Sequence, residues 1–301
     1  MLVRDLIVEQ SCKCCGGMAL FYRDYDLSRT CEDRRKQVFP PAGINVPYYR
    51  CSKCEFVFTR YFDTWSSKEM GERIYNADYI LADPEFADIR PAYMSGNLAK
   101  LLAPLKGCIS ILDYGGGAGR LVANLQASGF ADSVCFDPYF SNSVKPTRQF
   151  ELVTSFEVVE HSADPAATFQ EAMSYVKPSG AMLFSTIICG KKTDPDWWYI
   201  APRNGHISIH SYWSLQRLAD VLGVKCLSLS DDTHILYRNA LSPLVRHLAE
   251  SHRPHAMYSA SKRGVRALLR TAHLFFEAGF AIHLRDVRHM ARAAARSLGI
   301  A

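Results

Sequence analysis

Short apolar runs alternate with amphipathic segments through the central part of the chain. Apolar runs predict strands at 109–113, 133–136, 151–155 and 181–187, and two amphipathic segments predict helices at 117–128 and 165–176. Pro178, Ser179 and Gly180 follow the second helix and predict a break there. Because strands that alternate with helices usually form a parallel sheet covered on both faces, the pattern predicts an α/β fold.

The pattern changes towards residue 240. Segment 211–222 predicts a third helix, with Ser211 as its N-cap and Gly223 as its end. Two further apolar runs, 224–229 and 234–237, flank the polar residues 231–233. Two strands joined by so short a polar turn pair antiparallel, so we expect the sheet to end in an antiparallel hairpin.

A glycine-rich loop follows the first predicted strand. The strand ends at Asp113, and glycines at 115, 116, 117 and 119 precede the first helix. Glycines let the backbone turn tightly and approach a ligand, while the N-terminus of a helix offers free N–H groups. A dinucleotide fingerprint would need glycine at 120 or 122, where the chain has Arg120 and Val122.

A second acid and a third segment extend this pattern. Asp137 ends the next strand, 18 residues after Gly119, where a carboxylate can accept both hydroxyls of a ribose. With segment 150–161, these features resemble class I methyltransferases, near the ubiquinone-pathway O-methyltransferases, over about residues 95–240. The resemblance implies a Rossmann-like methyltransferase sheet, a terminal antiparallel hairpin and S-adenosylmethionine as cofactor. The implied cofactor-binding residues are Asp113, Gly115, Gly116, Gly117, Gly119, Asp137, Phe156 and Glu157.

One observation qualifies the resemblance. Only thirteen residues separate Asp137 from Glu151, too few for the usual helix, strand and helix, so we expect the third strand to be short or absent. The alternative to a cofactor site is a glycine-rich turn beside an ordinary solvated aspartate.

Six of the ten cysteines lie before residue 55. Cys12 and Cys15 form one C-x-x-C pair and Cys51 and Cys54 another, and two such pairs supply four thiolates for a structural zinc. The 35-residue spacer is longer than in common zinc ribbons, and Cys14 or Cys31 are alternative ligands. The other interpretation is buried or incidental thiols. A site filled by four thiolates leaves no open position for chemistry, so its expected role is support or substrate capping.

Acids and histidines gather after the fourth strand. Glu157, Glu160 and His161 have helical spacing, and His206 follows the next strand. The set resembles the magnesium site of small-RNA 2′-O-methyltransferases and ubiquinone-pathway enzymes, which implies that magnesium activates an acceptor hydroxyl. The alternatives are a metal-free base, His161 or His206, or a packing role for Glu160 and His161.

Aromatic residues follow the strand at 181–187. Trp197, Trp198 and Tyr199 occupy the loop where this fold admits its acceptor, and their rings suit either stacking on a sugar or covering the end of the sheet. For Tyr75 and Tyr79, packing is favoured over closing the cofactor site.

Charge is uneven along the chain. The net charge is +5, yet residues 241–301 hold ten Lys or Arg against three Asp or Glu. Arg285, Arg288, Arg292 and Arg296 would form one basic stripe on a helix, suited to an anionic lipid surface or nucleic acid. A solvated helix face is the alternative. The absence of a signal-peptide pattern predicts a cytoplasmic protein.

These features predict four parts: a zinc ribbon (1–60), a helical connection (61–105), the methyltransferase core (106–240) and a basic helical tail (241–301). The expected activity is methyl transfer to an oxygen of a small-molecule or glycan acceptor. An RNA 2′-O-methyltransferase is the first alternative, weakened by the lack of a recognisable RNA-binding module. The second is a non-catalytic scaffold with a methyltransferase-like fold.

Overall fold

The computed structural model describes residues 9–140, 143–238 and 241–251. The chain forms two compact units, Met1–Val245 and Arg246–Ala301. Helix α7 (Pro243–Ser251) is the last described element, so the predicted arginine stripe lies outside the described residues. In the described part of the chain, no helix is long and apolar enough to cross a membrane.

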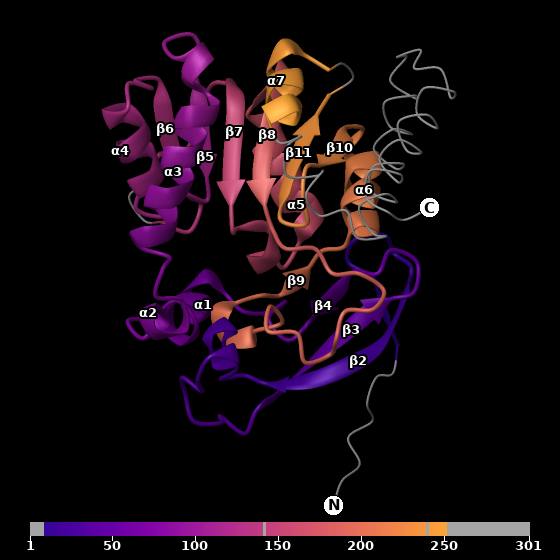
Figure 1. Cartoon of the computed structure of the whole chain (residues 1–301). Helices are drawn as coiled ribbons and strands as arrows, with labels where there is room; N and C mark the ends of the chain where they lie inside the picture. The colour runs from indigo at the N-terminus through magenta and orange to yellow at the C-terminus, as the bar shows by residue number, and fades with distance from the viewer. Residues whose placement is uncertain (1–8, 141–142, 239–240, 252–301) are drawn as a thin grey trace, which may run out of the picture. The chain divides into compact units, whose positions relative to one another are not determined.

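The larger sheet has the strand order β10-β11-β8-β7-β5-β6 (Figure 1). Its parallel strands are β5 (Ile111–Tyr114), β6 (Ser133–Phe136), β7 (Phe150–Phe156) and β8 (Val176–Ser185). Strand β11 (Thr233–Tyr237) runs antiparallel to both β8 and β10 (Lys225–Ser228). The predicted α/β fold with a terminal antiparallel hairpin is therefore confirmed.

The sheet also confirms the missing third strand. Among the described residues, β6 is the edge of the sheet, and 137–149 contains no helix or strand. One boundary prediction is wrong, because β8 begins at Val176 and runs through the expected break at 178–180. Val176 pairs with Phe150 at an irregularity in the register, and a Cβ at position 180 would lie 2.5 Å from the Glu151 carbonyl oxygen. The glycine therefore permits close strand pairing.

The helices beside this sheet begin and end at recognisable residues. They are α3 (Ile89–Leu101), α4 (Arg120–Ala127), α5 (Pro165–Ser174) and α6 (Tyr212–Leu222). Ser211 caps α6 by accepting the Ser214 N–H at 3.0 Å, and left-handed Gly223 ends it, as predicted. Helix α4 starts three residues later than expected because Gly117 and Gly119 have positive φ.

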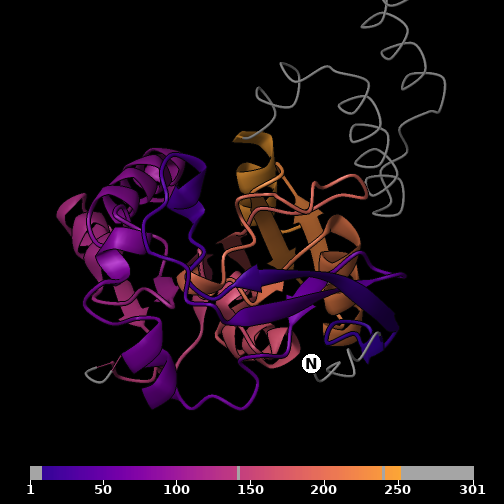
Figure 2. The same cartoon turned by 90° about the horizontal axis from the view of Figure 1, so that it is seen from below.

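A second, antiparallel sheet has the order β1-β2-β3-β4-β9. The N-terminal segment supplies β1 (Glu9–Ser11), β2 (Met18–Asp26), β3 (Asn45–Cys51) and β4 (Val57–Thr59). The last strand, β9 (Ser208–Ile209), comes from the segment between β8 and α6. In Figures 1 and 2 this sheet lies across the carboxyl ends of the parallel strands.

The two sheets share a hydrophobic core. Phe56, just before β4, and Phe58, within it, belong to the same buried cluster as Phe169 of α5 and Leu215 of α6. Between the sheets the chain forms α1 (Ser67–Arg73) and α2 (Tyr79–Ala82). A short 3-10 turn, η1, covers Cys31–Arg34. The N-terminal segment therefore packs as part of the same unit that holds the larger sheet.

Candidate functional site

Asp113 lies at the carboxyl end of β5, which pairs with β7 on one side and with the edge strand β6 on the other. Its side chain is buried and accepts a hydrogen bond from Thr154 Oγ1 at 2.8 Å. Burial raises the pKa of Asp113 to about 6, and the nearby Asp137 acts in the same direction. A buried carboxylate with one neutral donor is a strong acceptor for a cationic ligand.

The glycine loop wraps around this carboxylate. Gly115, Gly117 and Gly119 all have positive φ, which explains why side chains are missing there. Gly116 is needed for another reason: a Cβ at this position would overlap the Asp113 carboxylate and lie 2.8 Å from Cys135 Sγ. The loop ends at α4, whose first N–H groups face the same edge of the sheet.

Asp137 follows β6 and binds the loop directly. Its Oδ2 accepts the Gly117 N–H at 2.9 Å, and its Oδ1 accepts the Tyr139 N–H at 2.8 Å. The two predicted acids thus lie on either side of one loop, at the carboxyl ends of neighbouring strands. Phe156 lies at the same edge as the last residue of β7.

A cavity of about 620 Å³ opens beside the loop. Its walls include Gly117 and Gly119 of the loop, Cys135 of β6, Phe140 of the segment that replaces the third strand, and Phe150, the first residue of β7. The short connection after Asp137 therefore leaves space at the sheet edge.

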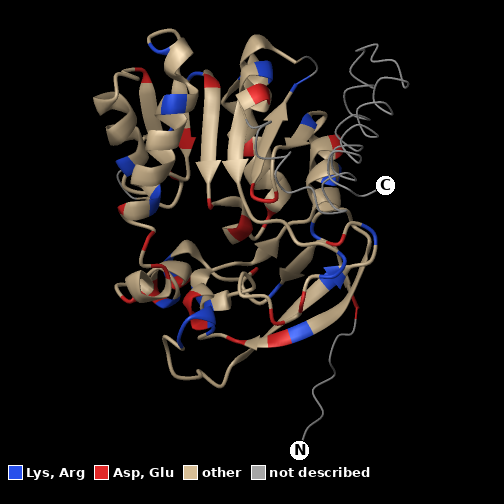
Figure 3. Cartoon of the chain, in the orientation of Figure 1, with Lys and Arg blue, Asp and Glu red and all other residues tan. Residues whose placement is uncertain are grey.

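The second predicted cluster lies where the two sheets meet. One ring nitrogen each of His161 and His206 and a carboxylate oxygen of Glu160 lie within 4.8 Å of one another. Val159–His161 form a single 3-10 turn, and His206 lies just before β9. Several loops at this edge of the sheet are acidic (Figure 3).

Glu157, Glu160 and His161 do not lie on one helical turn, although their spacing would allow it. The backbone of Glu157 has φ 54°, in the left-handed region that residues other than glycine rarely adopt. Glu157 therefore does not share a helix face with Glu160 and His161. It lies outside the three-residue cluster. Its N–H donates to Ser185 Oγ at 2.9 Å, and the Ser185 hydroxyl donates back to its Oε1 at 2.8 Å. Burial, with a smaller contribution from the nearby Glu160 carboxyl group, raises the pKa of Glu157 to about 8.

Hydrogen bonds fix the tautomer of both histidines. His206 Nδ1 lies 2.7 Å from the Tyr199 carbonyl oxygen, and His161 Nδ1 lies 3.1 Å from the Gly205 carbonyl oxygen. A carbonyl only accepts, so each Nδ1 carries the proton and each Nε2 keeps its lone pair. Burial lowers the pKa of both imidazoles, that of His206 to about 3, so both are neutral.

Glu160 is fully buried in this cluster. Its Oε1 accepts from the Tyr199 hydroxyl at 2.7 Å, while its Oε2 has no hydrogen-bond partner among the described residues. Burial raises the pKa of its carboxyl group. The cluster therefore brings together a carboxylate oxygen and one nitrogen from each of two neutral imidazole rings, a set of atoms that can bind a cation.

The N-terminal segment supplies the opposite wall. The Tyr75 hydroxyl lies 3.2 Å from His161 Nδ1, and Cys31 Sγ lies 3.8 Å from His206 Nδ1. Arg90 forms a bidentate ion pair with Asp83 at 2.9 and 2.7 Å. Tyr75 is thus exposed at the site, whereas Tyr79 is buried, as its predicted packing role requires.

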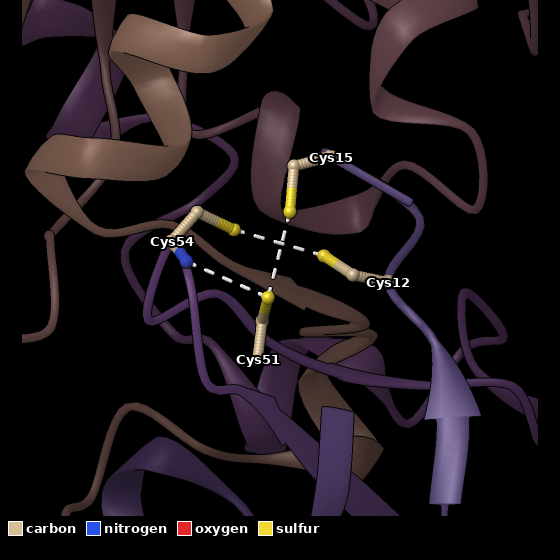
Figure 4. Close-up of side chains that lie close together, drawn as sticks. All are labelled: Cys12, Cys15, Cys51 and Cys54. Carbon is tan, nitrogen blue, oxygen red and sulfur yellow. Dashed lines mark hydrogen bonds between the residues drawn. The ribbon is translucent and has the colours of Figure 1, made fainter. Parts of the chain in front are cut away.

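The four predicted cysteines converge (Figure 4). Cys12 Sγ lies 3.7 Å from Cys54 Sγ, and Cys15 Sγ lies 3.5 Å from Cys51 Sγ. These distances are far longer than a disulfide bond of about 2.05 Å and match the edges of a tetrahedron with metal–sulfur bonds of about 2.3 Å. Cys14 instead contacts the Ser214 carbonyl oxygen, and Cys31 lies beside His206.

Some residues of the site had no detectable pattern in the sequence. Of the two alternatives for Tyr199, burial excludes stacking on an acceptor, because only 1% of the residue is exposed; it hydrogen-bonds to Glu160 and His206 instead. The buried Tyr48 donates to the His206 carbonyl oxygen at 2.7 Å. Thr154, which orients Asp113, lies 41 residues from it. Only folding brings these groups together.

Part of the chain is similar to known proteins. Residues 86–229 match a family model described as a methyltransferase domain. A ubiquinone biosynthesis O-methyltransferase of Azorhizobium caulinodans is 34% identical over 116 residues, 31% of this chain and 45% of that protein. One from Citrobacter koseri is 28% identical over 158 residues, 49% of this chain and 64% of that protein. The chain thus spans less than two thirds of either relative.

Solved structures show partial likeness. An O-methyltransferase family protein from Burkholderia thailandensis aligns with a TM-score of 0.44 and 13% identity, covering 60% of this chain and 64% of that one. Magnesium protoporphyrin IX methyltransferase from Synechocystis, solved with its bound cofactor, aligns with a TM-score of 0.34 and 14% identity, covering 60% and 95%. Residues 86–229 thus match a methyltransferase domain, and the strands within this range belong to a Rossmann-like sheet.

Proposed function

We propose that this protein transfers the methyl group of S-adenosylmethionine to an oxygen of a small or carbohydrate-like acceptor. The observation that carries the proposal is the hydrogen-bonded group of Asp113, the glycine loop and Asp137 at the carboxyl ends of β5 and β6. Open α/β sheets bind their ligands at this edge. The names of the two relatives, both O-methyltransferases, favour oxygen as the acceptor atom.

Each group has a role in this proposal. Asp113 would hold the amino group of the cofactor, Asp137 its ribose hydroxyls, and the glycine loop would pass beneath it, with Phe156 and Glu157 beside it. Bound cofactor supplies an electrophilic methyl on a sulfonium sulfur. The protein's own tasks are alignment of the acceptor oxygen and removal of its proton.

A divalent cation at Glu160, His161 and His206 is the second element of the proposal, and magnesium is the cation that the sequence resemblance implies. Histidines that bind metals usually donate their other ring N–H to a carbonyl or carboxylate, as His161 and His206 do. His234, by contrast, has both ring nitrogens hydrogen-bonded, to Ser228 and Thr186. A cation here would lower the pKa of an acceptor hydroxyl. Without one, the lone pair of His161 or His206 is the candidate base.

A structural zinc at Cys12, Cys15, Cys51 and Cys54 is the third element. The sulfur distances fit a tetrahedral site, and none of the ten cysteines, all of which are among the described residues, forms a disulfide. Elemental analysis of purified protein should give one zinc per chain, and Cys54→Ser should lower this value and the melting temperature together. Full zinc content in Cys54→Ser would place the metal elsewhere.

The cofactor site is tested by calorimetric titration. S-adenosylmethionine should bind the zinc-loaded protein with micromolar affinity, and Asp113→Ala should weaken binding at least tenfold by removing the partner of the cofactor amino group. Lys225→Ala, an exposed change on β10, is the matched control and should bind like the parent. Folded parent protein that does not bind the cofactor would overturn the enzymatic proposal and favour a scaffold.

A further inference from the structure

Tyr199 contacts two members of the Glu160, His161 and His206 cluster through different atoms. Its hydroxyl donates to Glu160 Oε1 at 2.7 Å, and its carbonyl oxygen accepts from His206 Nδ1 at 2.7 Å. Its ring also packs against the His206 ring, with centroids 4.4 Å apart. Among the described residues, no other residue forms hydrogen bonds to both of these side chains.

The side chain is held firmly enough to fix these contacts. Tyr199 is 1% exposed, its hydroxyl accepts the Ile187 N–H at 3.3 Å, and Thr186 Oγ1 lies 3.4 Å away. Its ring packs against those of Trp197 and Trp198, at centroid distances of 5.3 and 5.5 Å. Rotation of the phenol would leave a buried hydroxyl without partners, which is costly.

These contacts decide which atoms of the cluster remain free. The phenol occupies Oε1 of Glu160 and leaves Oε2 without a partner among the described residues. The carbonyl oxygen accepts a hydrogen bond from His206 Nδ1–H, which leaves the lone pair of the ring on Nε2. Two potential ligand atoms are thus defined by one residue.

We propose that Tyr199 is a positioning residue that orients Glu160 and His206 to bind a divalent cation. This inference rests on the proposed function, because it assigns a role within its cation site. The phenol acts through Glu160 and touches neither the cofactor residues Asp113 and Asp137 nor the cysteine cluster in any described hydrogen bond. Its removal should therefore affect cation binding and leave cofactor binding unchanged.

The test is a titration with Mn²⁺, followed by the electron paramagnetic resonance signal of the free ion. Tyr199→Phe removes the hydroxyl and keeps the ring and the carbonyl. It should weaken Mn²⁺ binding about tenfold or more, the usual effect of losing a group that orients a ligand. Tyr25→Phe is the matched control: Tyr25 is 3% exposed and its hydroxyl donates to the Pro195 carbonyl oxygen, outside the cluster. It should bind Mn²⁺ like the parent.

A double-mutant cycle separates positioning from general loss of structure. If the phenol acts through Glu160, the double variant of Tyr199→Phe and Glu160→Gln should bind Mn²⁺ no more weakly than Glu160→Gln alone. Additive losses would overturn the proposal, as would equal Mn²⁺ affinity in Tyr199→Phe and Tyr25→Phe, or a parent protein that binds no Mn²⁺. A separate titration with S-adenosylmethionine reports on the cofactor site, so failure of the proposed function is distinguishable.

Discussion

Asp113 is a carboxyl group whose ionisation should govern cofactor affinity. Its pKa is raised to about 6 by burial, so the free protein takes up a proton there below that pH. Binding of the cofactor ammonium favours the carboxylate and must then release this proton. We predict that the dissociation constant of S-adenosylmethionine is nearly constant above pH 7 and rises about tenfold per unit below pH 6. Calorimetry between pH 5 and 8 measures it.

Asp113→Asn is the control for this prediction. The amide keeps the size of the side chain and its contact with Thr154 but does not titrate over this range. The variant should bind weakly at every pH, with a flat profile. A variant that keeps the pH dependence of the parent would assign the titration to another group.

The glycine loop between β5 and α4 depends on close packing as well as on backbone conformation. Gly116→Ala places a methyl group against the Asp113 carboxylate and Cys135 Sγ. We predict that it weakens cofactor binding at least tenfold and lowers the free energy of unfolding by about 1–3 kcal/mol, as overpacking does. Calorimetry and urea denaturation provide the two values.

The matched control is Gly190→Ala. Gly190 has no positive φ, and a Cβ there meets no atom within 4 Å. This variant should keep parental stability and affinity. If Gly116→Ala behaved in the same way, Asp113 would have freedom to move, and its fixed position would not be needed for binding.

Buried histidines make the stability of the whole molecule depend on pH. Burial lowers the pKa of His210 to about 3 and that of His234 to about 4, against about 6.5 in an unfolded chain. Between these values the unfolded state binds protons that the folded state does not. Stability is therefore fully present above pH 6.5 and falls with decreasing pH, by about 1.4 kcal/mol per pH unit for each histidine.

His210→Phe tests this assignment. The His210 ring packs against Phe56 and Phe169, and its Nε2 has no partner in the described part of the chain, so a phenyl ring suits the site. Urea denaturation at pH 7 and pH 5 should show a smaller loss of stability on acidification in the variant, by about 1.4 kcal/mol per unit. An unchanged difference would mean that other groups, such as carboxyls, cause the acid sensitivity.

The sequence by itself determined the sheet and its cofactor edge. The alternation of apolar runs with amphipathic segments predicts the strands. Asp113, the glycines and Asp137 can be identified because they follow the ends of two successive strands, within 25 residues of chain. The two C-x-x-C pairs were equally easy to recognise, because two thiolates at this spacing can bind one tetrahedral metal ion. These signals are local in the chain.

The tertiary structure decided what lies between the two sheets. Strand β9 has only two residues and forms because β4 provides a partner 150 residues away, so no local pattern predicts it. The same pairing places His206 beside Glu160, whose carbonyl accepts the Ile207 N–H at 2.8 Å. Tyr199 contacts Glu160 and His206 in this region. Glu157 has a left-handed backbone conformation, and its N–H donates a hydrogen bond to Ser185 Oγ. Such contacts involve residues that are distant in sequence, and the free energy of their packing outweighs the conformational preference of the local sequence.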